Sequence, residues 1–161
     1  MSLVIAVICT DGIVVSGDFR RSEYALDKNT KQYIPVGYTD NTHKLFRTKS
    51  NRIIAYTGRT TNEHSLDIDE RIKEMVDITD SMKLSLRQQL TFLIEYACCN
   101  TNAIIEVGIE NGQKTIMEWN QQSGMSYGVQ EGMIGAIGAT EVITKHQKEI
   151  EAKLKERNVV E

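Results

Sequence analysis

The chain opens with two short apolar runs, residues 3–9 and 12–19, which are rich in valine and isoleucine and are separated by the pair Asp11-Gly12. An Asp-Gly pair between two such runs is a strong short-range signal for a β-hairpin. Both sets of alternate positions in the first run are apolar, so both faces of this strand should be covered, as in an inner sheet. The two expected faces are Val4, Ala6 and Ile8 on one side and Ile5, Val7 and Cys9 on the other.

The rest of the apolar pattern predicts strands, then two helices, then strands and a last helix. Pro35 and Gly37 interrupt strand-like residues at 32–38, which indicates a separate hairpin there. Strand blocks on either side of a helical block favour an α+β fold, and a four-layer αββα sandwich would bury both sheets. Further strands are expected at 42–49, 52–57, 102–110, 114–119, 125–130 and 132–138, and helices from about 61, at 85–99 and at 139–157.

Length and composition predict one domain covering residues 1–161. The chain has 40% apolar and 25% charged residues, which is ordinary for a globular protein, and it is long enough to bury a core without disulfides. It contains one proline, Pro35, and no stretch rich in serine and glycine that would mark a linker. We therefore expect a single folded unit.

Charge and cysteine content limit the partners and the compartment. A net charge of −3 does not indicate a nucleic-acid binder. No apolar run approaches the roughly 20 residues that span a bilayer, and no basic region marks a secretory signal. The three cysteines, two of them adjacent at 98 and 99, do not form a disulfide framework. These features predict a cytoplasmic protein that binds neither nucleic acid nor membrane.

The residue after the initiator methionine is a candidate nucleophile. Ser2 directly precedes the first predicted strand, which would hold its amine and hydroxyl in a fixed place. A serine at a free N-terminus combines a nucleophile with its own base. Alternatively, Ser2 is simply the second residue of the chain, without a chemical role.

Four motifs follow one another in the first part of the chain. They are the opening strand with its Asp-Gly turn, Ser16-Gly17-Asp18, Lys44-Leu45-Phe46, and a strand ending in Tyr56-Thr57-Gly58. In this order they resemble proteasome β-type subunits and the bacterial HslV-type peptidase, which are N-terminal nucleophile hydrolases. The chain differs from the pattern of that family by an insertion before Lys44, spanning roughly residues 26–38.

The resemblance implies a fold, a reaction and a set of site residues. The fold would be the four-layer αββα sandwich of N-terminal nucleophile hydrolases, shortened at its C-terminal end. The reaction would be hydrolysis of a peptide or small amide by Ser2 after removal of Met1, without metal or organic cofactor. Lys44, paired with Asp18, would lower the pKa of the hydroxyl, and backbone N–H groups near Gly58 would stabilise the oxyanion.

The second half of the chain leaves a non-catalytic alternative open. Residues 131–140 resemble the apolar strand of the family that leads into a long helix, but Ala139 stands where the family has a serine. The segments that carry a supporting aspartate and serine in the family have no counterpart before Glu161. The chain could therefore be an inactive scaffold or binding subunit, with Asp18 and Lys44 as ordinary surface residues and Gly58 as a simple turn.

Other chemistries have less support. His43, His64 and His146 are far apart and lack metal-ligand spacing. Cys9 lies inside the first strand and is expected to be a small core residue. Because the resemblance implies ring-forming relatives and the shortened sheets would have open edges, we expect a homo-oligomer.

Overall fold

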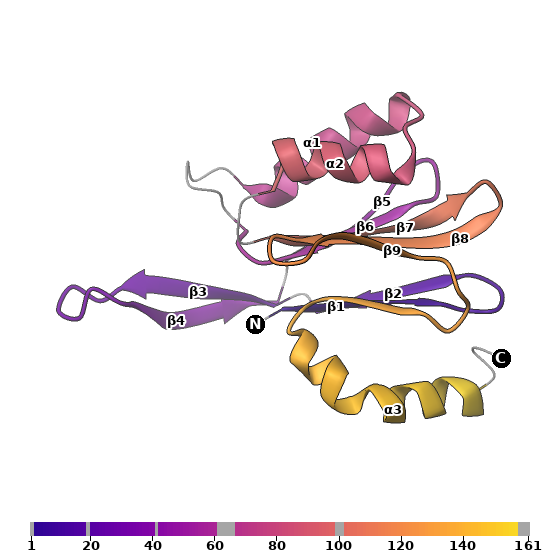
Figure 1. Ribbon diagram of the computed structural model, residues 1–161. Coiled ribbons are helices and arrows are strands. Elements are labelled where there is room, and N and C mark those ends of the chain that lie inside the picture. Colours follow the sequence, from indigo (N-terminus) through magenta and orange to yellow (C-terminus); the bar gives the residue numbers. More distant parts are fainter. Residues whose placement is uncertain (1, 19, 41, 61–66, 99–101, 158–161) are drawn as a thin grey trace.

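The computed structural model describes residues 2–18, 20–40, 42–60, 67–98 and 102–157, and it has a mixed α+β fold with antiparallel sheets, as predicted (Figure 1). Its strands are β1 (Leu3–Ile8), β2 (Ile13–Gly17), β3 (Arg21–Leu26), β4 (Tyr33–Thr39), β5 (Leu45–Arg47), β6 (Ile53–Thr57), β7 (Ala103–Glu110), β8 (Gln113–Asn120), β9 (Gly124–Gly128) and β10 (Ile134–Gly138). Its helices are α1 (Ile68–Ser81), α2 (Leu86–Tyr96) and α3 (Thr140–Glu156).

The strands form two sheets and a separate ribbon. The order β5-β6-β7-β8-β9 gives a five-stranded sheet, and β10-β1-β2 gives a three-stranded sheet. Every pairing is antiparallel, and β1 is the central strand of the smaller sheet, with Ala6 opposite both Gly135 and Val15. The predicted β1–β2 hairpin is therefore confirmed, and β1 is covered along both edges.

The two faces of β1 pack as its alternating apolar pattern predicts. Val4, Ala6 and Ile8 join a buried cluster with residues of the five-stranded sheet, such as Ile105 and Ile116. On the other face, the cluster contains Val7, Cys9, Ile5 and, from α3, Leu154. In Figure 1 the smaller sheet accordingly lies between the five-stranded sheet and α3.

Helices α1 and α2 cover the outer face of the five-stranded sheet. Their buried side chains, among them Ile72 and Leu90, pack with Tyr56 of β6 and Ile104 of β7. Ser85, where the sequence predicted this helix to begin, caps α2. The structure shows a capping box, in which the Ser85 hydroxyl accepts from the N–H of Gln88. Residues of these helices do not belong to the buried cluster between the two sheets, which consists of side chains from strands of both sheets, among them β1.

Helix α1 differs from its prediction at its start. The sequence predicted a helix from about residue 61, but α1 begins at Ile68, and residues 61–66 lie outside the described part of the chain. Asp67 caps the helix, since its carboxylate accepts from the N–H of Asp69. Helical periodicity cannot locate such a boundary by itself, because capping depends on one local side chain.

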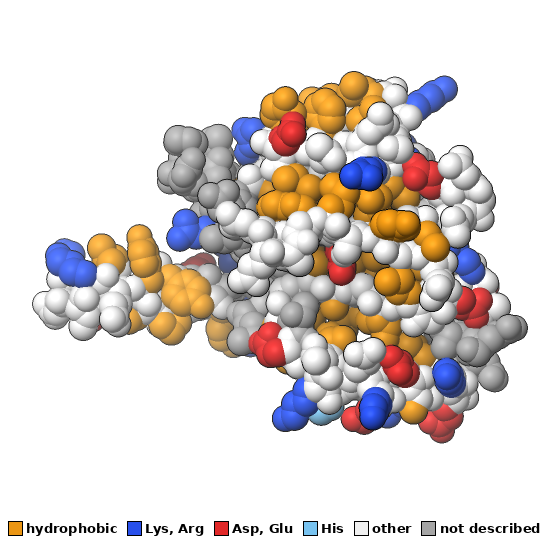
Figure 2. All heavy atoms as spheres, in the orientation of Figure 1, with side chains coloured by type: hydrophobic (Ala, Val, Ile, Leu, Met, Phe, Trp, Pro, Cys, Tyr) orange, Lys and Arg blue, Asp and Glu red, His pale blue; other side chains and the backbone are white. Residues whose placement is uncertain are grey.

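The β3–β4 ribbon projects from the body of the protein (Figure 1). It is longer than the hairpin predicted at residues 32–38, because β3 begins three residues after Asp18 and pairs along its whole length with β4. Figure 2 shows hydrophobic side chains along its exposed surface. This ribbon is called the arm below.

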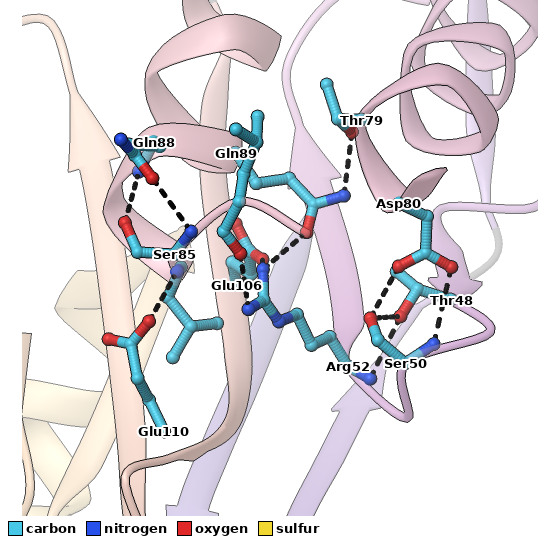
Figure 3. Close-up of polar contacts among 12 residues, drawn as sticks. Thr48, Ser50, Arg52, Thr79, Asp80, Ser85, Gln88, Gln89, Glu106 and Glu110 are labelled. Carbon is cyan, nitrogen blue, oxygen red and sulfur yellow. Dashed lines mark hydrogen bonds and ion pairs between the residues drawn. The ribbon is translucent and has the colours of Figure 1, made fainter. Parts of the chain in front are cut away.

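A buried carboxyl group lies between α2 and the five-stranded sheet (Figure 3). The Glu106 side chain of β7 is fully buried, and its nearest cation is the Arg52 guanidinium at 3.5 Å, too far for a good hydrogen bond. Arg52 instead donates to Gln89 Oε1 at 2.9 Å and to the Leu84 carbonyl at 2.7 Å. Burial raises the pKa of Glu106 to about 8, because desolvation outweighs the attraction of Arg52.

The stability of the protein should therefore decrease as the pH rises from mildly acidic to mildly basic. The pKa of Glu106 is about 8 in the folded protein, against an ordinary value of 4.5. Its contribution to the free energy of unfolding is therefore complete below pH 4.5 and is lost as the pH rises through about 8. We expect the free energy of urea unfolding to drop by on the order of 4 kcal/mol more in the wild type than in Glu106→Gln between pH 5 and pH 9. Equal pH dependence in both proteins would contradict this assignment.

Candidate active site

The ammonium group of Lys44 joins three segments at one end of the sheets. Its Nζ donates to Ser2 Oγ at 2.7 Å, to Asp18 Oδ1 at 2.7 Å and to the Arg20 carbonyl at 2.6 Å. Lysine has three N–H donors, and each has an acceptor here. The residue is only 1% exposed. The structure thus brings together three residues that the sequence singled out, Ser2, Asp18 and Lys44.

The β1–β2 hairpin places Ser2 beside Asp18. Ser2 directly precedes β1 and Asp18 directly follows β2, so the antiparallel pairing brings them to the same end. The pairing continues in the main chain, where the Asp18 N–H donates to the Leu3 carbonyl at 3.1 Å. The Leu3 N–H in turn donates to Asp18 Oδ2 at 3.1 Å. One carboxylate oxygen therefore fixes the backbone, while the other holds Lys44.

Lys44 enters the site from the loop before β5. The predicted strand at 42–49 is shorter in the structure, since only Leu45–Arg47 pair with β6. The Lys44 carbonyl still accepts from the N–H of Tyr56 at 3.1 Å, which anchors its backbone to β6. The side chain is then free to reach across to the smaller sheet.

This arrangement favours a negative charge on the Ser2 oxygen. A buried cation at hydrogen-bond distance stabilises an alkoxide more than the neutral hydroxyl. Asp18 balances the charge of Lys44 while the cluster is at rest, at a separation of 2.7 Å. The Ser2 hydroxyl is therefore held in position beside the fixed ammonium group of Lys44.

Ser2 also borders a cavity of about 700 Å³. Gly58, the fourth predicted site residue, lines the same cavity at the end of β6 but does not belong to the Lys44 cluster. Gly58 has φ +103°, a conformation that L side chains rarely adopt. Most other lining side chains are small or carry amides, including Asn102, Asn120 and Gln121. The cavity therefore offers space for a ligand next to the hydroxyl.

The turn between β10 and α3 holds the backbone of Ser2. The Ala139 N–H donates to the Ser2 carbonyl at 2.9 Å. Gly138 has φ +93°, and a Cβ at this residue would lie 2.0 Å from the Ser2 carbonyl oxygen. A glycine is thus required both for the backbone angle and for the close approach. Ala139 itself makes no side-chain cap at the start of α3.

Two parts of the site have no signal in the sequence. The Arg20 acceptor is a backbone carbonyl, which no residue type can reveal. Asp69 lies near Arg21, Lys44 and His43, and burial raises the pKa of its carboxyl while these cations oppose the rise. An acidic residue in the first turn of α1 is expected at any helix start, so its position near Lys44 could not be foreseen.

Among the described residues, the remaining candidates from the sequence do not come together as a site. Cys9 is 3% exposed and packs in the core, as predicted. His43 and His146 lie in different parts of the fold, and His64 lies outside the described residues. Within the described part of the chain, no group of three His, Cys, Asp or Glu side chains is placed to hold a metal ion. No described helix combines the length and apolar character needed to cross a bilayer.

Comparisons with known proteins reveal a likeness in fold. No protein-family model matches the chain, and no curated protein matches it. Among solved structures, the chain is similar to Anbu (ancestral beta-subunit) from Yersinia bercovieri, with a TM-score of 0.50 and 10% sequence identity. The similarity covers 93% of this chain but 65% of that one, so this chain spans less than two thirds of the length of Anbu.

These findings correct the family assignment made from the sequence. The prediction that the chain is a shortened, divergent proteasome β-type or HslV-like member of the N-terminal nucleophile hydrolases is wrong, because no family model recognises it. The four motifs are short, and a β-hairpin with an Asp-Gly turn occurs in many folds. At 10% identity, the likeness to Anbu concerns the fold alone.

Proposed function

We propose that Ser2, Asp18 and Lys44 form an active site that hydrolyses an amide bond in a peptide or small amide, with Ser2 as the nucleophile after removal of Met1. One observation carries the proposal: the buried Lys44 ammonium lies 2.7 Å from both the Ser2 hydroxyl and the Asp18 carboxylate. A buried cation aimed at a hydroxyl is an arrangement that raises nucleophilicity.

In the proposed reaction, the free α-amine of Ser2 acts as the base. Its reference pKa of roughly 7.7–8.0 suits proton transfer near neutral pH. The amine takes the proton of the hydroxyl, directly or through water, as Oγ bonds to the carbonyl carbon. The resulting ammonium returns the proton to the leaving nitrogen as the C–N bond breaks, which leaves an ester on Ser2. Water then attacks the ester carbonyl, gives its proton to the amine, and releases the acid as Oγ regains a proton.

The remaining residues have supporting roles in this proposal. The Lys44 ammonium stabilises the charge that develops on Oγ, while Asp18 holds Lys44 in place. Gly58 lines the cavity, and its backbone N–H is the proposed donor to the carbonyl oxygen of the tetrahedral intermediate. The reaction needs no metal or organic cofactor, since base, nucleophile and cation all come from the chain.

We propose that a four-layer αββα sandwich presents this site. The packing of α1 and α2 on β6 and β7, and that of Val4, Ala6 and Ile8 against the five-stranded sheet, support the first three layers. The contact of Leu154 in α3 with the opposite face of β1 supports the fourth. In this arrangement the site lies at the end of the two central layers, where Ser2 and Gly58 border one cavity.

Replacing Ser2 by alanine should remove hydrolysis altogether. Alanine keeps the backbone bond to Ala139 but lacks the hydroxyl that would attack the substrate. We expect release of a fluorogenic amine from a panel of acyl amides to fall from the wild-type rate to background in Ser2→Ala. Ser126→Ala, which changes an exposed serine on β9, is the control and should keep the wild-type rate. Equal turnover by Ser2→Ala and the wild type would rule out the proposed nucleophile.

A non-catalytic binding subunit is the second candidate. All three donors of the buried Lys44 ammonium already have acceptors within the chain, as expected for a lysine that only joins segments. Ala139 also contributes no polar side chain beside Ser2. On this alternative, Lys44 would stabilise the fold, and no amide in the panel would be cleaved by the wild type.

A further inference from the structure

The arm exposes large apolar side chains to solvent, although such side chains are usually buried in folded proteins. Six residues of its two strands are between 44% and 69% exposed: Tyr24, Leu26, Tyr33, Ile34, Val36 and Tyr38. The arm extends away from both sheets (Figures 1 and 2). A two-stranded ribbon alone is only marginally stable in water, and contiguous exposed apolar surface commonly marks an interaction site.

The pairing of β3 with β4 sorts these side chains onto two faces. Directly paired residues share a face, and so do alternate residues of one strand. The face defined by the pairs Ser22–Tyr38, Tyr24–Pro35 and Leu26–Tyr33 carries no charge and is called the tyrosine face. The opposite face carries Arg21 and Glu23. Val36 is the additional residue at the bulge between the two halves of the ribbon.

We propose that the tyrosine face is a docking surface for the tyrosine face of a second copy of this chain, with the two arms packed face to face about a twofold axis. Such an interface must be complementary to itself. A face without charged residues meets this condition, because no like charges are brought together. The Arg20 guanidinium at the base of the arm is already paired with Asp40 at 2.8 Å, so it adds no free cation.

The area of the tyrosine face is sufficient for a modest dimer. Tyr24, Tyr33 and Tyr38 are 56%, 69% and 63% exposed. With about 150–250 Å² for each tyrosine, they leave roughly 300–450 Å² per arm uncovered. Two arms, with Leu26 and Pro35 included, approach the roughly 1,000 Å² that a specific interface needs. Interfaces at this small end of the range are typical of weak, transient contacts, so we expect a dissociation constant on the order of micromolar.

Docking through the face is favoured over pairing through the edges of the arm. Pro35 lacks an N–H to donate to an added strand, and the bulge opposite Glu23 and Tyr24 interrupts a regular edge. The base of the arm also connects this surface to the site. Arg20 lies over the ring of Tyr38 at 4.1 Å, and its own carbonyl accepts from Lys44. Docking that orders Tyr38 would thus also order Arg20, whose carbonyl accepts from Lys44.

Sedimentation velocity of the full chain over a range of concentrations tests the proposal. The wild type should be a dimer above roughly 10 µM, and the double variant Tyr24→Ser/Tyr33→Ser should be monomeric or bind at least 10-fold more weakly. The matched control is Tyr96→Ser/Tyr127→Ser, which removes two exposed tyrosines from the body, 52% and 71% exposed, and should sediment like the wild type.

Three results would overturn the proposal. The first is a wild type that stays monomeric at roughly 100 µM. This result would overturn the proposal even if the arm bound lipid vesicles or another protein instead. The second is an arm variant that dimerises like the wild type, and the third is equal weakening by the body variant. A thermal melt checks that both variants remain folded. Replacement of residues 24–35 by a two-residue Asn-Gly turn is a second arm variant, which should also be monomeric.

Discussion

Replacing Lys44 by methionine is expected to lower the rate of amide hydrolysis by at least 100-fold. Methionine fills a similar volume but cannot donate to the Ser2 hydroxyl or balance Asp18, both of which lie 2.7 Å from the ammonium. Loss of one group that stabilises a developing oxyanion commonly costs about 10²–10³ in kcat. The measurement is kcat at saturating substrate for the wild type and Lys44→Met, both with Met1 removed.

A matched control separates the local effect of Lys44 from a general loss of charge. Lys49 is exposed in the loop between β5 and β6, so Lys49→Met should keep the wild-type kcat. Lys44→Met also breaks the ion pair between buried Lys44 and partly exposed Asp18, and its free energy of unfolding should be measured beside its rate. A folded Lys44→Met enzyme with wild-type kcat would show that the cation is structural only.

Gly138→Ala is expected to destabilise the protein and to displace Ser2. The new Cβ would lie 2.0 Å from the Ser2 carbonyl oxygen, and the residue would keep an unfavourable φ of +93°. Backbone strain of this kind costs about 1–3 kcal/mol. Because the obstructing atom belongs to the backbone, relief requires movement of the residue proposed as nucleophile. Urea unfolding and amide hydrolysis should therefore both be impaired.

Gly112→Ala isolates the effect of the collision. Gly112 has φ +77° in the turn between β7 and β8, but nothing lies within 4 Å of a Cβ built there. The control variant should therefore lose only the strain contribution and keep full activity. We expect Gly138→Ala to lose at least about 2 kcal/mol more than the control. Equal losses of unfolding free energy in the two variants would mean that the clash between the new Cβ of residue 138 and the Ser2 carbonyl is relieved without cost.

The sequence predicted best those elements whose residue pattern indicates both the type of secondary structure and which faces are buried. The faces of β1 were predictable because both sets of alternate residues are apolar, which requires cover on each side. The start of α2 was predictable because Ser85, a good N-cap residue, directly precedes its apolar stripe. The arm was only partly predictable, since Pro35 and Gly37 obscure a strand that pairs with β3 on both sides of a bulge.

The site was predictable where a side chain carries the contact. Ser2, Asp18 and Lys44 are far apart in the sequence, and motif order suggested their association before the structure placed them together. The Arg20 carbonyl has no residue-specific signal. Glu106 was missed for a different reason. A single glutamate in the apolar run of β7 resembles an exposed edge position, and only the packing of α2 shows that it is buried.

In the proposed reaction, the Ser2 hydroxyl at a free N-terminus is the nucleophile. Mass spectrometry of the purified protein, before and after reaction with a β-lactone probe that acylates activated hydroxyls, tests it most directly. We expect that Met1 is absent, that one probe is attached per chain, and that peptide mapping places it on Ser2. Lys44→Met should react far more slowly. Retention of Met1, or attachment of the probe to another residue with Ser2 unmodified, would contradict the claim.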